Sequence, residues 1–176
     1  MKTKDLHLYE QLHLNDNHYG STPLHHSPKI IDFIVDQKPK SILDFGCGKA
    51  SLKPFISDRF PEIVFDNYDP AIPQYSSINQ SSYDMVISVD VMEHLYEDEI
   101  LGIFQEIVNL NPSSMYHVIC HRLAHAILPD QTNAHKTVQP PSWWLDKFRS
   151  FSFMFNYNIS FESDSLEAGY FNFIKK

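Results

Sequence analysis

The chain has 176 residues, of which 43% are hydrophobic and 20% charged, so it suits one globular domain and is too short for two substantial ones. Its formal net charge of −8 argues against a broad basic surface for nucleic-acid phosphates. No apolar run reaches the roughly 18 residues of a membrane span, and the two cysteines are too few for a disulfide framework. We therefore expect a cytoplasmic protein, since the N-terminus also lacks the apolar core of a signal peptide.

The first predicted elements follow a polar N-terminal segment. Residues 1–22 are His-rich and lack clear periodicity, so we expect an N-terminal arm or lid ahead of one domain over residues 23–176. Pro28 and the apolar stripe behind it predict a helix over 27–37. The apolar run 41–45 predicts a strand that ends at a glycine pair and leads into another helix.

The middle of the chain predicts a parallel sheet. Residues 63–65 and 84–89 are continuous apolar runs, which suit strands that are covered on both faces. No strand is evident between them, so we expect the sheet to be shortened there. Apolar residues at helical spacing predict a helix over 97–110, and the run 115–120 predicts a further strand.

The C-terminal part predicts a long loop and two more strands. Prolines interrupt the stretch between residues 121 and 141, and the aromatic-rich runs 151–161 and 169–174 predict antiparallel strands joined by a turn. The whole pattern predicts an α/β fold: a single Rossmann-like domain with a mostly parallel central sheet, an antiparallel C-terminal strand and helices on both faces.

The turn after the first predicted strand carries chemical information. Gly46, Cys47 and Gly48 lie where a strand meets a helix, and glycines there let backbone amides approach a ligand. Asp44, two residues before the first glycine, can hold an ammonium group. Asp69 follows the next strand, 21 residues after Gly48, a separation at which a carboxylate accepts hydrogen bonds from ribose hydroxyls.

Each of these signals has an ordinary explanation, because a glycine pair also makes tight turns and an acid at a strand end also caps helices. Asp66 is a second candidate for the ribose. A third signal comes from Asp90, Glu93 and His94, which follow the strand over 84–89. Ligands bind at the carboxyl edge of such sheets, so the order of the three signals favours a nucleotide-like cofactor.

Residues 44–49 and 90–94 together resemble the signature of class I S-adenosylmethionine-dependent methyltransferases. A closer similarity to compact bacterial and phage-type members spans roughly residues 18–148. The segments that carry it are 68–73, 128–130, 133–135 and 143–144.

This resemblance implies S-adenosylmethionine as methyl donor and S-adenosylhomocysteine as product. It places Asp90 near the reacting centre. The residues that it implies for the cofactor are Asp44, Gly46, Cys47, Gly48, Asp69 and Asp90, with Tyr19 and Gly20 closing over it.

Two residues depart from the family pattern. Ala50 and Gln131 stand where many relatives have glycine, and we expect cofactor binding to survive because alanine is tolerated at a helix start. The strand whose following loop often holds the adenine is the one missing from the sheet, so the adenine contacts stay unassigned.

The acceptor side is predicted from histidines and tryptophans. His135 is a candidate general base and acceptor contact, and Asp90 and His94 are further catalytic candidates. Trp143 and Trp144 are candidates for an apolar wall around the acceptor. Both tryptophans could instead pack a short helix onto the sheet, and His94 could instead be a partner in a helix cap.

The histidines at positions 117, 121 and 125 are spaced like metal ligands on one helix face. We expect no metal, because the first of them lies in a predicted strand and no further ligand is evident beside it.

The rival functions are a nicotinamide-dependent oxidoreductase, whose glycine pattern fails at Ser51, and a methyltransferase-like binding module without turnover. The acidic charge favours a small-molecule acceptor over nucleic acid, with no membrane contact. We expect a monomer or a homodimer.

Overall fold

The computed structural model describes residues 3–21, 26–163 and 167–176. One six-stranded sheet forms its centre, in the order β2-β1-β3-β4-β6-β5. The four strands from β2 to β4 run parallel, and β6 runs antiparallel to both of its neighbours. The strands are β1 (Ser41–Phe45), β2 (Val64–Tyr68), β3 (Met85–Val89), β4 (Ser114–Cys120), β5 (Tyr157–Ser163) and β6 (Ala168–Lys175).

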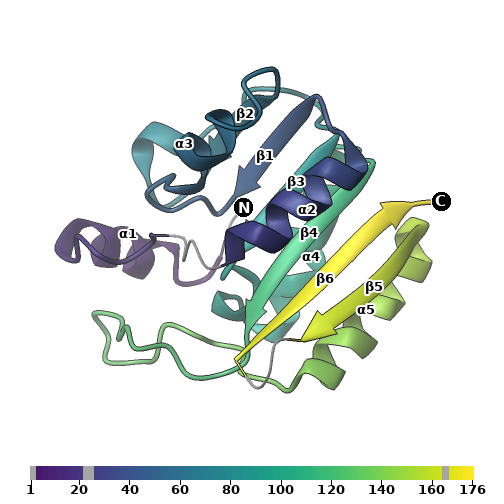
Figure 1. Ribbon diagram of the computed structural model, residues 1–176. Helices are drawn as coiled ribbons and strands as arrows, with labels where there is room; N and C mark the ends of the chain where they lie inside the picture. The colour runs from purple at the N-terminus through teal and green to yellow at the C-terminus, as the bar shows by residue number, and fades with distance from the viewer. Residues whose placement is uncertain (1–2, 22–25, 164–166) are drawn as a thin grey trace.

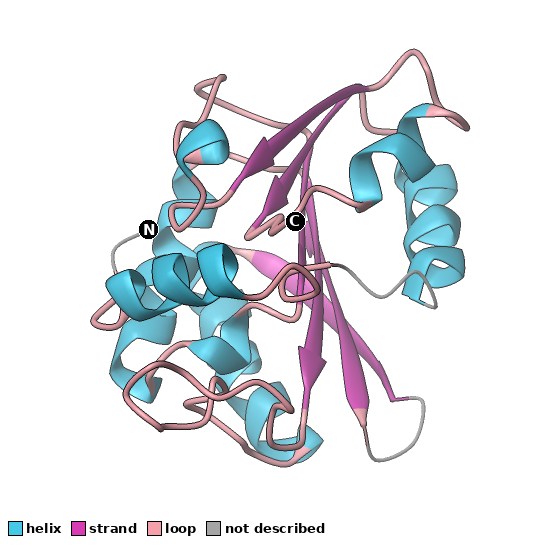
Figure 2. Ribbon diagram, turned by 90° about the vertical axis from the view of Figure 1, so that its left-hand side faces the viewer, coloured by secondary structure: helices cyan, strands magenta, loops and turns pink. Residues whose placement is uncertain are grey.

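Helices cover both faces of this sheet, as predicted (Figure 2). Apolar residues of α2 (Ser27–Gln37) and α3 (Leu52–Ser57) pack against one face. The other face is covered by α4 (Glu97–Asn109) and α5 (Pro141–Phe155), which share one core cluster with residues of β1, β3, β4 and β6. The strands buried between the helices account for the continuous apolar runs, because neither face meets water.

The shortened sheet is confirmed. Between β2 and β3 the chain forms only loops and one short 3-10 helix, η2 (Pro73–Tyr75). The parallel part therefore ends at β2, which is an edge strand.

The predicted strand over 151–161 is wrong in its first half. Residues up to Phe155 belong to α5, and β5 starts at Tyr157 after Asn156, which adopts a left-handed φ of 63°. The aromatic residues Phe151, Phe153 and Phe155 alternate as they would in a strand, but Phe153 is 86% exposed. Trp144, Phe148 and Phe151, which are spaced four and three apart, form the buried stripe of the helix.

Two further segments gather at the carboxyl edge of the parallel strands. The N-terminal segment forms the helix α1 (Leu6–Asn15), and a second 3-10 helix, η3 (Met92–His94), follows β3. The stretch from β4 to α5 is irregular, as predicted, apart from one bridge between Ile127 and Asn133. Figure 1 shows α1 and this long loop on the same side of the molecule.

Candidate active site

A cavity of about 270 Å³ lies at the carboxyl edge of the parallel strands. Its walls come from α1, the turn after β1, the ends of β2 and β3, and the long loop after β4. The predicted site residues that line it are Tyr19, Gly20, Gly46, Gly48, Asp69, Asp90, His94 and His135. The fold thus brings together residues that are more than a hundred positions apart in the chain.

The glycine turn needs its glycines for backbone reasons. Gly46 and Gly48 have φ values of +79° and +50°, a region that other residues reach only at a cost. A Cβ on Gly46 would lie 2.5 Å from the Cγ2 atom of Val91. The amides of Gly46 and Cys47 donate to the Tyr68 carbonyl, 2.7 and 3.1 Å away, so the turn is tied to the end of β2. The Cys47 side chain is buried and does not line the cavity.

The segment before α2 closes over this turn. A Cβ on Gly48 would lie 2.1 Å from the Gly20 carbonyl oxygen, and that oxygen accepts a hydrogen bond of 2.8 Å from the Lys49 amide. Tyr19 lines the cavity beside it. Its burial raises the pKa of the phenol far above the ordinary value, and Asp69 adds to this shift.

Asp69 is fixed by the backbone around it. Its Oδ2 accepts a hydrogen bond from the Gly48 amide at 2.9 Å and its Oδ1 accepts one from the Ala71 amide at 2.9 Å. A carboxylate has about four acceptor positions, so both oxygens keep capacity for hydroxyl donors in the cavity. Asp66, the second candidate, instead accepts from the Tyr83 hydroxyl at 2.8 Å and does not line the cavity.

Asp44 lies deeper, one residue before the end of β1, and does not itself line the cavity. It is 1% exposed, and its Oδ2 has no hydrogen-bond partner among the described residues. Burial raises its pKa to about 7, and the nearby Asp69 adds to the shift. A cationic group near these two carboxylates would lower both pKa values. The glycine turn, the free acceptor positions of Asp69 and the unpartnered oxygen of Asp44 therefore fit the sugar and the ammonium group of S-adenosylmethionine.

Acidic residues also follow β3. Asp90 has a left-handed φ of 53°, and its amide donates to the Val118 carbonyl at 3.0 Å. Glu93 is fully buried in η3, and its Oε1 accepts a hydrogen bond of 2.8 Å from the Cys120 amide. Burial raises the pKa of Glu93 well above its usual value, and the Asp90 carboxylate raises it further.

Two histidines face one another beside these acids. The rings of His94 and His135 lie 4.7 Å apart between centroids, at right angles. The Nδ1 of His94 lies 2.9 Å from the Ala134 carbonyl, and that of His135 lies 2.6 Å from the Arg122 carbonyl. Because a carbonyl only accepts, each Nδ1 carries the proton and each Nε2 keeps its lone pair. Burial lowers the pKa of His94 to about 3 and also lowers the pKa of His135.

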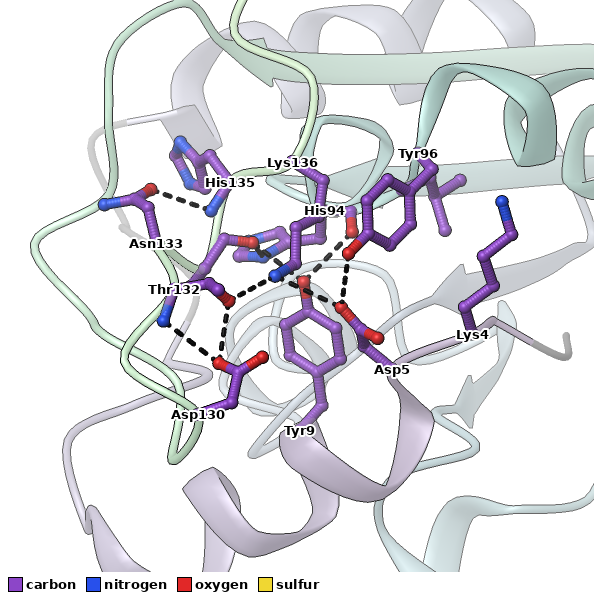
Figure 3. Close-up of polar contacts among 12 residues, drawn as sticks. Lys4, Asp5, Tyr9, His94, Tyr96, Asp130, Thr132, Asn133, His135 and Lys136 are labelled. Carbon is purple, nitrogen blue, oxygen red and sulfur yellow. Dashed lines mark hydrogen bonds and ion pairs between the residues drawn. The ribbon is translucent and has the colours of Figure 1, made fainter.

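Contacts between the N-terminal arm and the long loop surround these histidines (Figure 3). The Tyr9 hydroxyl lies 2.8 Å from the Ala134 carbonyl and 3.0 Å from the His94 carbonyl, and its proton is shared between them. The Lys136 ammonium lies 3.1 Å from an Asp5 carboxylate oxygen, with 5% of its side chain exposed. The arm is therefore held to the loop by polar contacts and not only by apolar packing.

The tryptophans lie elsewhere. Trp144 is fully buried in the core between α5 and the sheet, and Trp143 lies against this core with the Lys147 ammonium 4.4 Å from its ring centroid. Neither residue lines the cavity. Both tryptophans thus pack α5 onto the sheet, and we do not propose them as an apolar wall around the acceptor.

Several residues that line the cavity were missed in the sequence. Tyr9 and His13 point to it from α1, and Cys120, Arg122 and His125 reach it from β4 and the loop behind. The four-residue spacing of Tyr9 and His13 places them on one helix face, and Cys120 ends a parallel strand, so both positions carried a signal. Arg122 lies in irregular backbone, which carries none, and the four-residue spacing of His125 from His121 indicated only a metal ligand.

Ala50 and Gln131, the two departures from the family glycines, both have positive φ, 56° and 69°. Ala50 is not at a helix start, because α3 begins two residues later. Both residues therefore adopt a left-handed backbone conformation that costs glycine less conformational energy.

No protein-family model and no curated protein sequence matches the chain. Among solved structures, an O-methyltransferase family protein from Burkholderia thailandensis has a TM-score of 0.61 at 12% identity over 85% of this chain and 56% of that one. The chain thus spans little more than half of that protein. A DhpI–SAH complex has a TM-score of 0.62 at 10% identity, with 97% and 96% of the chains covered.

The PigF structure with SAH has a TM-score of 0.58 at 15% identity, over 85% of this chain and 56% of the other. At these identities the likeness concerns the fold. Among the helices that the structure describes, none combines the length and apolar character needed to cross a bilayer. The chain has the Rossmann-like fold of S-adenosylmethionine-dependent methyltransferases.

Proposed function

We propose that the chain is an S-adenosylmethionine-dependent methyltransferase that acts on a small-molecule acceptor. The observation that carries this proposal is that the glycine turn, Asp69 and Asp90 line one cavity at the carboxyl edge of the sheet. Open α/β sheets bind their ligands at that edge. S-adenosylmethionine supplies an electrophilic methyl group on a sulfonium sulfur when it is bound.

The chain's own residues would hold the cofactor at three points. Asp69 would accept hydrogen bonds from the ribose hydroxyls while the Gly48 and Ala71 amides keep its carboxylate in place. Asp44 would lie near the ammonium group, since its Oδ2 is buried without a partner in the described structure. Tyr19 and Gly20 would cover the bound cofactor from the N-terminal segment.

Positioning is the larger part of the catalysis that this site would provide. Holding two reactants in line is worth about 7–11 kcal/mol, whereas a general base adds about 3–5 kcal/mol. His94 is a weak base, because its pKa is about 3. Asp90 and His135 are therefore the proposed bases, because both line the cavity.

The size of the cavity supports a small acceptor. Ligand sites commonly measure about 300–1,000 Å³, and the cavity of about 270 Å³ is just below this range. We infer that the arm must move outward for cofactor and acceptor to bind together. A net charge of −8 also disfavours a polyanionic acceptor.

Calorimetry of S-adenosylmethionine binding tests the proposal. Asp69→Asn removes the charge but keeps the shape, and hydrogen bonds to a charged group are worth about 1.5–3 kcal/mol, so we expect affinity to fall by about 10–150-fold. Asp66→Asn is the matched control, because this residue lies in β2, three positions before Asp69, but outside the cavity. Equal affinity of both variants would exclude the assigned ribose contact.

Turnover separates the enzyme from the binding module. We expect S-adenosylhomocysteine to form when the protein is incubated with S-adenosylmethionine and a library of small hydroxyl, amine and thiol compounds. Tight cofactor binding without product from any acceptor would support the binding module instead.

A further inference from the structure

Three side chains with metal-binding atoms meet beside the cavity. One ligand atom each of Glu93, Cys120 and His135 lies within 4.8 Å of the other two. The residues come from η3, the end of β4 and the long loop, so the cluster is formed only by the fold. We propose that Glu93, Cys120 and His135 form a binding site for a divalent transition-metal ion, with Zn²⁺ as the favoured ion.

The donor atoms fit zinc. A thiolate, an imidazole and a carboxylate are all ligands that zinc takes, and three protein ligands with an open fourth position are typical of catalytic sites. Bond lengths of about 2.0–2.3 Å imply ligand atoms about 3.5 Å apart in a tetrahedron. The three ligand atoms, which lie within 4.8 Å of one another, would therefore have to approach one another by at most about 1.3 Å. Mg²⁺ and Ca²⁺ fit poorly, because they prefer oxygen ligands.

Other contacts already orient the donors. The Cys120 amide donates to Oε1 of Glu93, and the carbonyl of Glu93 accepts hydrogen bonds from the amides of Lys136 and Thr137 at 2.8 and 3.0 Å. The imidazole of His135 donates its Nδ1 proton to the Arg122 carbonyl. Metal ligands are commonly fixed in this way, by a carbonyl or carboxylate that sets the orientation and tautomer of the ring.

The second, independent observation is that no positively charged group pairs with the buried carboxyl of Glu93. This residue is 0% exposed, and its Oε2 receives no hydrogen bond from an N–H donor in the described part of the chain, while the Asp90 carboxyl lies beside it. An unpaired polar atom of this kind is costly to bury. No ion pair between Glu93 and Arg122 occurs among the described residues, and the guanidinium of Arg122 donates to the Leu123 carbonyl at 3.5 Å. A bound cation would pair with this oxygen and offset the repulsion between Glu93 and Asp90.

The metal site gives the proposed methyltransferase a class of acceptor, and this part of the inference rests on the proposed function. Cys120 and His135 line the cavity, so an ion held by them would be accessible to the acceptor. Such an ion would stabilise the anionic form of a hydroxyl, amine or thiol, whose proton would pass to Asp90. His135 is then a metal ligand, and Asp90 is the remaining base beside the acceptor.

Titration of metal-free full-length protein with Co²⁺ tests the site. Co²⁺ substitutes for zinc and gives a near-ultraviolet charge-transfer band when a thiolate binds it. We expect one equivalent of Co²⁺ to produce this band, and Zn²⁺ to abolish it by displacement. Histidines of the N-terminal arm that bind Co²⁺ would not give a thiolate band, so the readout is specific.

Variants assign the ligands. We expect Cys120→Ser to lose the band and Cys47→Ser, which changes the other cysteine, to keep it. Glu93→Gln and His135→Ala should weaken Co²⁺ binding at least about tenfold. Even substitutions of residues that only hydrogen-bond to a metal ligand lower metal affinity by about 10–100-fold. His7→Ala, an exposed position, should have no effect.

The absence of a thiolate band in folded wild-type protein, or a band that persists in Cys120→Ser, would overturn the metal site. Circular dichroism of each variant confirms that it is folded. S-adenosylmethionine binding is measured separately by calorimetry. Cofactor binding without the cobalt band would contradict only the proposed metal site. The cobalt band without cofactor binding would contradict only the proposed function.

Discussion

Gly48 and Gly102 provide the same substitution with opposite expected effects. In Gly48→Ala the new Cβ would lie 2.1 Å from the Gly20 carbonyl oxygen, at a φ of +50°. The left-handed backbone costs alanine about 1–2 kcal/mol. Displacement of Gly20 also breaks its 2.8 Å hydrogen bond with the Lys49 amide, which is worth about 0.5–1.5 kcal/mol. We therefore expect the free energy of unfolding to fall by about 1.5–3.5 kcal/mol.

Gly102 lies in the interior of α4, is exposed, and has nothing within 4 Å of the position of a Cβ. Alanine is favoured over glycine in a helix by about 1 kcal/mol, so we expect Gly102→Ala to raise the free energy of unfolding by about that amount.

Urea unfolding of both variants, followed by circular dichroism, measures the two changes, and calorimetry measures cofactor affinity in parallel. We expect Gly48→Ala to bind S-adenosylmethionine more weakly than its folded fraction explains, because the Gly20 segment no longer closes over the turn. Gly102→Ala should bind it like the wild type. Equal stability and affinity of Gly48→Ala and the wild type would refute the close approach of residues 20 and 48.

Two further predictions concern the arm and the core. Asp5→Asn leaves the nearly buried ammonium of Lys136 without its ion-pair partner, so amide hydrogen exchange in α1 should become faster while exchange in α4 stays unchanged; equal rates in α1 would contradict this. His117 is fully buried, and burial lowers its pKa to about 3 from the ordinary 6.5. The unfolded chain thus takes up the proton first, so stability is lost as the pH falls from 6.5 towards 3. Between pH 7 and pH 5 this amounts to about 2 kcal/mol. Urea unfolding of His117→Gln at both pH values should show a loss smaller by that amount, and an identical loss would exclude His117 as a source.

The sequence predicted the part of the fold that depends on local pattern. The continuous apolar runs became β1, β3 and β4, and the stripe at 97–110 became α4. The region 151–155 failed because its aromatic residues alternate and favour strands by propensity, whereas the helical spacing of four and three starts earlier, at Trp144 and Phe148. Here the helix is stabilised by burial of Phe148 and Phe151 against the sheet, a tertiary effect.

The candidate site also has a part that the sequence pattern predicted and a part that depends on tertiary packing. The carboxyl-edge rule predicted that Gly46, Asp69 and Asp90 would meet, because the ends of parallel strands share one edge. It could not predict the contribution of α1, since the Tyr9 hydroxyl donates to the carbonyl of Ala134, a residue 125 positions away in the chain. Trp144 was ambiguous for a related reason, because burial against the sheet and contact with a ligand require the same apolar side chain.

The missing strand and the N-terminal arm are connected features of this fold. Without a strand beyond β2, the loop that contains Ala71 has no neighbouring strand on its outer side. The arm covers this loop, because Leu8, Tyr9, Leu12 and Ala71 share a core cluster with Leu128 and Ala134 of the long loop. The same cluster thus joins two sides of the cavity. Ala71 is two residues after the loop residue Asp69 on the proposed cofactor side, and Ala134 precedes His135 on the proposed acceptor side. Movement of α1 would open both sides at once, so the arm is the element through which cofactor binding and acceptor entry would be coupled.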